Sequence, residues 1–178
     1  MKTKRSLLLF GILSFLTILV MIVLSNRGTE VPLYINKPIC LSLDRMEKLM
    51  KDKPSLRNGQ YKYKLIAFVD SKECTPCAIN QLYAWYVYFE INRKILRDVE
   101  LIPVFDVIKS DMDRIKYAYR NSAYQDAIYL DTCHSFTKEN AFINHSCVFL
   151  VNSSGKILSS GNPLKDSKAG KRIRSILN

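Results

Sequence analysis

An uncharged apolar run near the N-terminus divides the chain into two parts. Residues 6–24 read SLLLFGILSFLTILVMIVL, and no charged residue lies between Arg5 and Arg27. As a helix, this run spans about 28 Å, close to the thickness of the hydrocarbon core of a bilayer. The exit from this run, Ile-Val-Leu-Ser-Asn-Arg, is a poor match to the A-x-A pattern of a signal-peptidase site. The sequence therefore predicts an uncleaved signal anchor, a transmembrane helix within residues 1–25.

The charges beside this run predict its orientation. Lys2, Lys4 and Arg5 precede the run, and basic residues tend to stay on the cytoplasmic side of a membrane. We therefore expect a single-pass protein of the inner (cytoplasmic) membrane, with its C-terminal domain outside the cytoplasm, in the periplasm.

Length and composition leave room for one further domain. The 178 residues leave room after the run for a domain of about 120 to 150 residues, enough for a core that folds without disulfide staples. The formal net charge is +11, but the basic residues are scattered and form no dense stripe, so we expect no nucleic-acid partner. The five cysteines have uneven spacing, unlike a disulfide scaffold: Cys40, Cys74, Cys77, Cys133 and Cys147.

Residues 26–60 are predicted to form a connector. Three prolines punctuate it, and residues 42–51 have the spacing of a short amphipathic helix with Ser42 as its N-cap. The apolar residues expected on one face of that helix are Leu43, Met46, Leu49 and Met50.

Beyond residue 60, short apolar runs alternate with helical segments. Strands are predicted at 65–70, 101–107 and 127–131, and helices at 78–94 and 111–119. A hairpin at 147–152 and 156–160 and a helix at 166–177 complete the chain. This order, β-α-β-α-β followed by a hairpin and a helix, predicts an α/β fold with a central mixed sheet over residues 61–178.

A dithiol motif, Cys74-Thr75-Pro76-Cys77, joins the first of these strands to the first helix. At a helix start, unpaired backbone N–H groups and the helix dipole favour an anion, so Cys74 should form a thiolate readily. Pro76 fits the first turn, which has no use for its missing N–H. Cys77 is expected to point inward on the same face and to resolve a mixed disulfide. We predict that Cys74 and Cys77 are catalytic, with Thr75 and Pro76 between them and Glu73 immediately before them.

Residues 65–177 resemble the thioredoxin superfamily, and among its members the membrane-anchored TlpA-like proteins. The resemblance lies in LIAFVDSKECTPC, in the hairpin FLVNSSGKI and in the Gly161-Asn162-Pro163 that follows it. It implies a thioredoxin-like fold and an extracytoplasmic thiol-disulfide oxidoreductase that reduces protein disulfides. The implied partners are extracytoplasmic protein thiols and disulfides and an upstream membrane electron donor, and no cofactor is implied.

Two positions depart from the pattern of this superfamily. Glu73 replaces the tryptophan that usually precedes the first cysteine, and its carboxylate opposes thiolate formation at Cys74. Ser146 stands where the substrate-binding loop usually has a cis-proline. A cis bond before another residue costs about 2.5 to 4 kcal/mol, so we expect a trans bond. Cys147, beside it, could be a third redox thiol or a metal ligand, and its favoured role is a small apolar filler.

Two other classes of function are consistent with these residues. The first is a membrane-tethered copper or zinc chaperone similar to Sco-type proteins, although their paired cysteines are spaced differently. Its candidate ligands would be Cys74, Cys77, Cys133, His134, His145 and Cys147. The second is a redox-inactive binding module on the same scaffold. Covalent c-type haem is excluded because Ala78, not histidine, follows Cys77.

Overall fold

The computed structural model describes residues 34–51 and 61–178. The predicted signal anchor lies outside these residues. Within them, no helix combines the length and the apolar character needed to cross a membrane.

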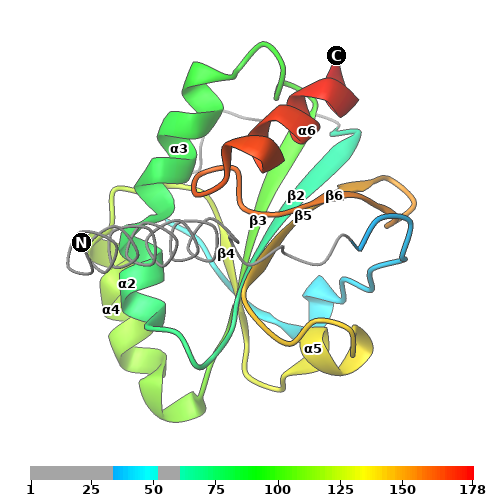
Figure 1. Ribbon diagram of the computed structural model, residues 1–178. Helices are drawn as coiled ribbons and strands as arrows, with labels where there is room; N and C mark the ends of the chain where they lie inside the picture. The colour runs from blue at the N-terminus through cyan, green and yellow to red at the C-terminus, as the bar shows by residue number, and fades with distance from the viewer. Residues whose placement is uncertain (1–33, 52–60) are drawn as a thin grey trace, which may run out of the picture. The chain divides into compact units, whose positions relative to one another are not determined.

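In this part of the chain, a six-stranded mixed sheet forms the centre of the domain (Figure 1). Its strand order is β1-β4-β3-β2-β5-β6, with β2, β3 and β4 parallel and the other pairings antiparallel. This arrangement confirms the predicted mixed sheet and the hairpin. The strands are β1 (Glu47–Leu49), β2 (Tyr63–Val69), β3 (Val99–Asp106), β4 (Ile128–Asp131), β5 (Cys147–Asn152) and β6 (Ile157–Ser160).

The helices cover the two faces of the sheet unequally. One face packs against α2 (Thr75–Asn80), α3 (Leu82–Ile91), α4 (Met112–Asn121) and α6 (Ser167–Leu177). The other face packs against α5 (Ser135–Glu139), on the opposite side of the sheet in Figure 1, and against the segment that begins at Tyr34. Side chains of β2 alternate between the two cores, since successive residues of a strand point to opposite faces. Leu65 and Ala67 enter the first core, and Ile66 and Phe68 the second.

The helix predicted at 78–94 is two helices that end earlier. The break is at Gln81, whose backbone N–H is shared between the carbonyls of Cys77 at 3.2 Å and Ala78 at 3.1 Å. α3 then ends at Ile91, and turns lead into β3. The short helix α5 was not predicted, because five residues are too few to give a helical period.

The helix predicted at 42–51 is wrong. A short 3₁₀ turn, η1 (Leu43–Arg45), is followed by β1, which pairs with the edge of β4. A strand here satisfies backbone groups along that edge, and it sends Met46 and Leu49 into different cores instead of onto one helical face. Ser42 caps no helix, and its hydroxyl donates to Glu139 Oε2 at 2.8 Å. Residues 34–51 thus belong to the same compact unit as residues 61–178.

Candidate active site

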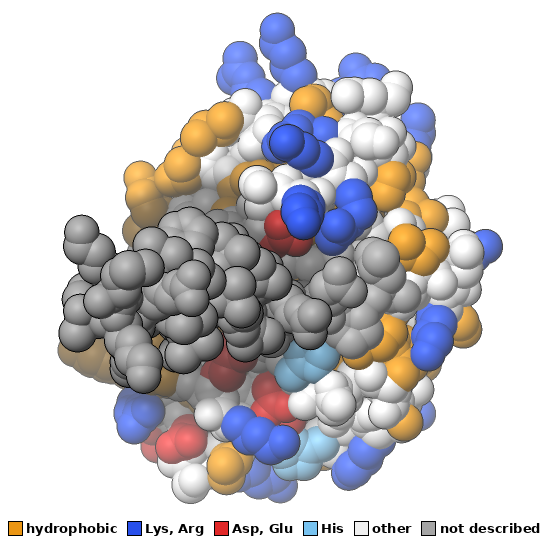
Figure 2. Space-filling model, in the orientation of Figure 1, with side chains coloured by type: hydrophobic (Ala, Val, Ile, Leu, Met, Phe, Trp, Pro, Cys, Tyr) orange, Lys and Arg blue, Asp and Glu red, His pale blue; other side chains and the backbone are white. Residues whose placement is uncertain are grey.

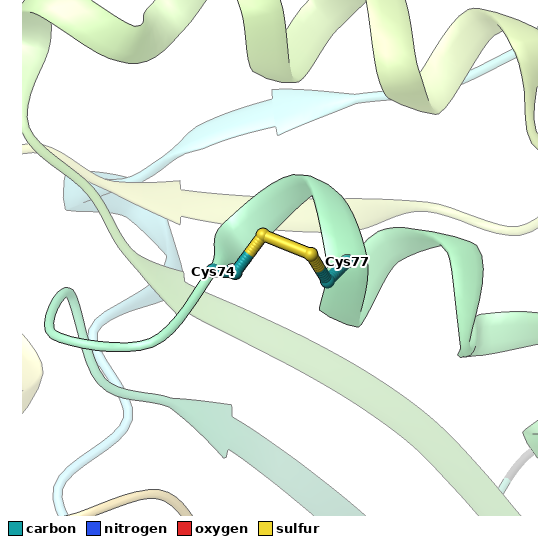
Figure 3. Close-up of a disulfide and its surroundings, with 2 residues drawn as sticks. All are labelled: Cys74 and Cys77. Carbon is teal, nitrogen blue, oxygen red and sulfur yellow. A yellow bond between two sulfur atoms is a disulfide. The ribbon is translucent and has the colours of Figure 1, made fainter.

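Cys74 and Cys77 form a disulfide where the loop after β2 enters α2. Figure 3 shows the bond spanning the first turn of the helix, and the two Cα atoms are 5.2 Å apart. Cys74 is the N-cap residue, and its carbonyl accepts the first helical hydrogen bond from Ala78 N–H at 3.0 Å. Pro76 lies within the first turn, as predicted. β2 pairs with β3 on one side and β5 on the other, so the loop that leads to the dithiol extends from a central strand of the sheet.

Asp70 shapes the loop that carries the dithiol. Its carboxylate Oδ1 accepts the backbone N–H of Lys72 at 2.8 Å, and its carbonyl accepts that of Glu73 at 2.9 Å. Its own N–H donates to Ser146 Oγ at 2.7 Å, which connects this loop to the residue before β5. Asp70 is only 8% exposed, and its hydrogen bonds to this loop, although only partly buried, hold the turn.

Both sulfur-bearing residues are exposed, which corrects the expectation that Cys77 points inward. The inward positions of α2 are Thr75 and Ile79, four residues apart and therefore on one face. Cys77 lies midway between them in sequence and so falls on the outer side of this short helix. A thiol or disulfide of another protein can therefore approach either sulfur.

Reduction of this disulfide would leave Cys74 at a helix start beside an acidic residue. The unpaired N–H groups of the first turn stabilise a thiolate there. The exposed carboxylate of Glu73 opposes it. Solvent weakens both effects at an exposed site. The local arrangement therefore supports thiol–disulfide exchange, with only a modest net electrostatic effect on the Cys74 thiolate.

Ser146, predicted to lie in the substrate-binding loop, is the residue immediately before β5. Every peptide bond in the described residues is trans, so the expected trans bond before Ser146 is confirmed. Its hydroxyl is committed to Asp70 N–H, and its side chain is half-buried. The role of this loop in binding a substrate stays a prediction.

Cys147 is part of a core. Its side chain is 5% exposed, and it packs in the cluster that contains Phe68 and Phe149. Burial raises the pKa of this thiol to about 11, so it is protonated at neutral pH. The favoured prediction, a small apolar filler, is therefore confirmed, and a buried protonated thiol is poorly suited to exchange.

The candidate metal ligands are dispersed in the structure. Cys133 is exposed and unpaired, His134 Nδ1 lies 2.5 Å from Asp106 Oδ1, and His145 Nδ1 lies 2.6 Å from Asn144 Oδ1. Among the described residues, no three cysteine, histidine, aspartate or glutamate side chains are grouped to hold a metal ion. No observation here favours the metal chaperone.

Three aspartates at the ends of parallel strands were not predicted from the sequence to have a structural role. Asp70 follows β2, Asp106 ends β3 and Asp131 ends β4. Asp131 is fully buried and accepts the hydroxyl of Ser135 at 3.0 Å and the N–H of Phe136 at 2.7 Å. A visible signal was the aspartate that closes each apolar run, in LIAFVD, LIPVFD and AIYLD. Asp70 and Asp131 bind backbone N–H groups where the chain leaves the sheet.

Comparisons with known proteins identify the architecture. No protein-family model and no curated protein matches the chain. A solved structure from Chlorobium tepidum, assigned as thiol:disulfide interchange protein DsbE, matches with a TM-score of 0.55. The match has 13% identity and covers 83% of this chain and 100% of that one. The domain has a thioredoxin-like fold. At this identity the likeness shows the fold alone.

Two further solved structures are similar with lower scores. StoA from Bacillus subtilis is 20% identical over 58% of this chain and 75% of its own, with a TM-score of 0.44. A thioredoxin-like protein from Porphyromonas gingivalis is 20% identical over 65% of this chain and 76% of its own, with a TM-score of 0.47. The first match and the strand order together identify the thioredoxin-like fold.

Proposed function

We propose that the chain is a thiol-disulfide oxidoreductase that reduces disulfides in proteins outside the cytoplasm. The observation that supports this proposal is the exposed Cys74–Cys77 pair at the start of α2 in a thioredoxin-like fold. A dithiol in that position can exchange with a protein disulfide without rearrangement of the core. The roles of Cys74 as the attacking thiol and Cys77 as the resolving thiol belong to the same proposal.

The reduced pair would donate two electrons in two steps. The Cys74 thiolate attacks one sulfur of the client disulfide, the client S–S bond breaks, and the departing client sulfur takes up a proton. The Cys77 thiol then loses its proton and attacks Cys74 Sγ. The mixed disulfide breaks, and the second client sulfur leaves and is protonated. The pair is now oxidised, which is the state of the bond in Figure 3.

The proposed location rests on the sequence. The apolar run at 6–24, with basic residues before it, supports a single-pass anchor in the inner membrane with the domain in the periplasm. Each cycle leaves the pair oxidised, so continued reduction needs two electrons from outside the domain. We propose a membrane electron donor as their source.

Trapping of mixed disulfides tests the reaction. Cys77→Ser removes the resolving thiol, so adducts between Cys74 and extracytoplasmic proteins should accumulate and disappear on treatment with dithiothreitol. Cys74→Ser is the matched variant and should accumulate far fewer adducts. Both variants also carry Cys40→Ser and Cys133→Ser, which remove the other exposed thiols. Absence of adducts in the Cys77→Ser chain would contradict the proposal and favour a redox-inactive binding module.

The reduction potential tests the direction of electron flow. Dithiols of this kind span roughly −270 to −120 mV, and a reductant should lie in the lower half of that range. Equilibration of the Cys74–Cys77 pair with glutathione buffers measures the value. A potential near −120 mV would rule out the reducing role while leaving an oxidase role intact.

A further inference from the structure

Helix α3 is apolar on its inner face and largely apolar on its outer face, where Glu90 is the one exposed carboxylate of the helix. Its outer face exposes Tyr83 and Tyr86, which are 52% and 51% accessible, and Ile91, which is 78% accessible. A helix that is apolar all round is ordinarily covered on both sides. The residues that bury its inner face in the core are Leu82, Trp85 and Phe89.

The outer face has the chemistry of a membrane interface. Tyr83 and Tyr86 stack with their ring centroids 6.0 Å apart, so their apolar surfaces form one exposed patch. Tyrosine is enriched at the level of lipid headgroups, where an apolar ring and a polar hydroxyl are both satisfied. Figure 2 shows hydrophobic side chains along the edge of the molecule formed by α3.

Positive charge adjoins this patch. Arg93, Lys94 and Arg97 follow α3 and are exposed, and Figure 2 shows basic side chains near its C-terminal end. Asp98 partly offsets this charge, with its Oδ2 3.7 Å from Arg97 Nε. Basic residues beside exposed aromatic side chains match a surface of anionic lipid, which attracts cations and admits aromatic rings at its headgroups.

We propose that the outer face of α3, together with the basic segment 93–97, docks on the headgroup region of an anionic bilayer. The proposed anchor, whose apolar run ends at Leu24, ten residues before Tyr34, accounts only for the presence of a bilayer, and the choice of the α3 face rests on its aromatic and basic residues. Ten extended residues reach at most about 36 Å, so an anchored domain stays close to the bilayer. The α3 surface supplies a second membrane contact that rests on the proposed anchor and takes no part in the redox reaction.

Fluorescence quenching by brominated lipid tests the contact in the full-length chain. The chain contains one tryptophan, Trp85, so Trp85→Phe gives a dark background for a reporter at a chosen position. Tyr86→Trp places the reporter on the α3 face, and Tyr117→Trp places it on α4, at a residue that is 71% exposed. Each chain is reconstituted at one copy per nanodisc of phosphatidylcholine with one quarter phosphatidylglycerol.

Brominated acyl chains should quench the Tyr86→Trp reporter at least about twofold and the Tyr117→Trp reporter by less than about a tenth. Equal quenching at both positions, or none at Tyr86→Trp, overturns the proposal. Quenching that needs two copies per disc also overturns it, because the face would then bind a second copy. If Trp85→Phe disturbs the fold, the same reporters are read with Trp85 present and its signal subtracted.

Charge variants separate electrostatic attraction to anionic lipid from non-specific adsorption to the bilayer. Replacing the three basic residues of 93–97 with glutamine should at least halve the quenching at Tyr86→Trp. Replacing the three exposed lysines of 165–171 removes the same charge elsewhere and should leave the quenching unchanged. Equal effects of the two sets would overturn the role of the basic segment, as would quenching that persists undiminished in discs of phosphatidylcholine alone.

Discussion

Burial of the Cys147 thiol should lower the free energy of unfolding at alkaline pH. The side chain is 5% exposed, and burial raises its pKa from 9.0 to about 11. Below about pH 9 the folded and the unfolded chain both hold the proton, so the stabilisation is fully present. As the pH rises toward 11, the unfolded chain releases the proton first, and the equilibrium moves toward unfolding.

The difference of about two pKa units corresponds to about 2.7 kcal/mol, of which about 2 kcal/mol should be lost by pH 10.5. Urea unfolding at pH 8.0 and 10.5 measures it, in a chain that also carries Cys40→Ser, Cys74→Ser, Cys77→Ser and Cys133→Ser, so that no disulfide is present to exchange with the Cys147 thiolate once the chain unfolds. The comparison is Cys147→Ala, which loses packing at both pH values but cannot titrate. Tyr119, whose pKa burial raises to about 12, is common to both proteins and cancels.

The expected result is a loss of stability between the two pH values that is about 2 kcal/mol larger with Cys147 than with alanine. Equal losses in the two proteins would refute the reasoning, because the thiol would then have the same proton affinity in both states. A larger loss in the alanine variant would point to another group that titrates near the cavity.

Two further substitutions test a buried hydrogen-bonded side chain and the charge beside the dithiol. Asn140→Ala removes a side chain that is 1% exposed, accepts the N–H of Cys40 at 2.8 Å and donates to the carbonyls of Cys40 and Phe136 at 2.8 and 2.7 Å. Urea unfolding should show a loss of about 2 to 4 kcal/mol, and a loss below about 1 kcal/mol would contradict this assignment. Glu73→Gln removes a negative charge beside Cys74 and should raise the reduction potential by about 10 to 20 mV, with a smaller shift at high salt. A fall in potential would show that Glu73 does not oppose the thiolate.

The strands could be predicted because their apolar runs are short and bounded by turn residues. The run LIAFVD leads into the dithiol, and β2 indeed ends at Val69. The hairpin around Gly155 was also readable, since that glycine has a φ of 77°, which side-chain-bearing residues rarely adopt. Local sequence determines such features.

The segment at 42–51 could not be predicted in the same way. Its apolar residues have helical spacing, yet β1 forms because β4 offers an unpaired edge. That edge is built from residues about 80 positions further along the chain. Likewise, the burial of Cys147 depends on residues such as Phe68 from another strand, so sequence could rank its possible roles without choosing among them.

The exposure of Cys77 changes what determines which of the two sulfurs in the candidate site attacks first. When a resolving thiol is buried, access alone directs an incoming sulfur to the other cysteine. Here both residues are exposed, so access does not distinguish them. The distinction must then come from position, since Cys74 caps α2 and Cys77 lies within it. The helix start favours a thiolate at Cys74, and the charge of Glu73 opposes it. The ratio of adducts trapped by the Cys77→Ser and Cys74→Ser variants therefore measures how far the helix start outweighs the neighbouring charge. A ratio near one would mean that the site has no fixed attacking sulfur.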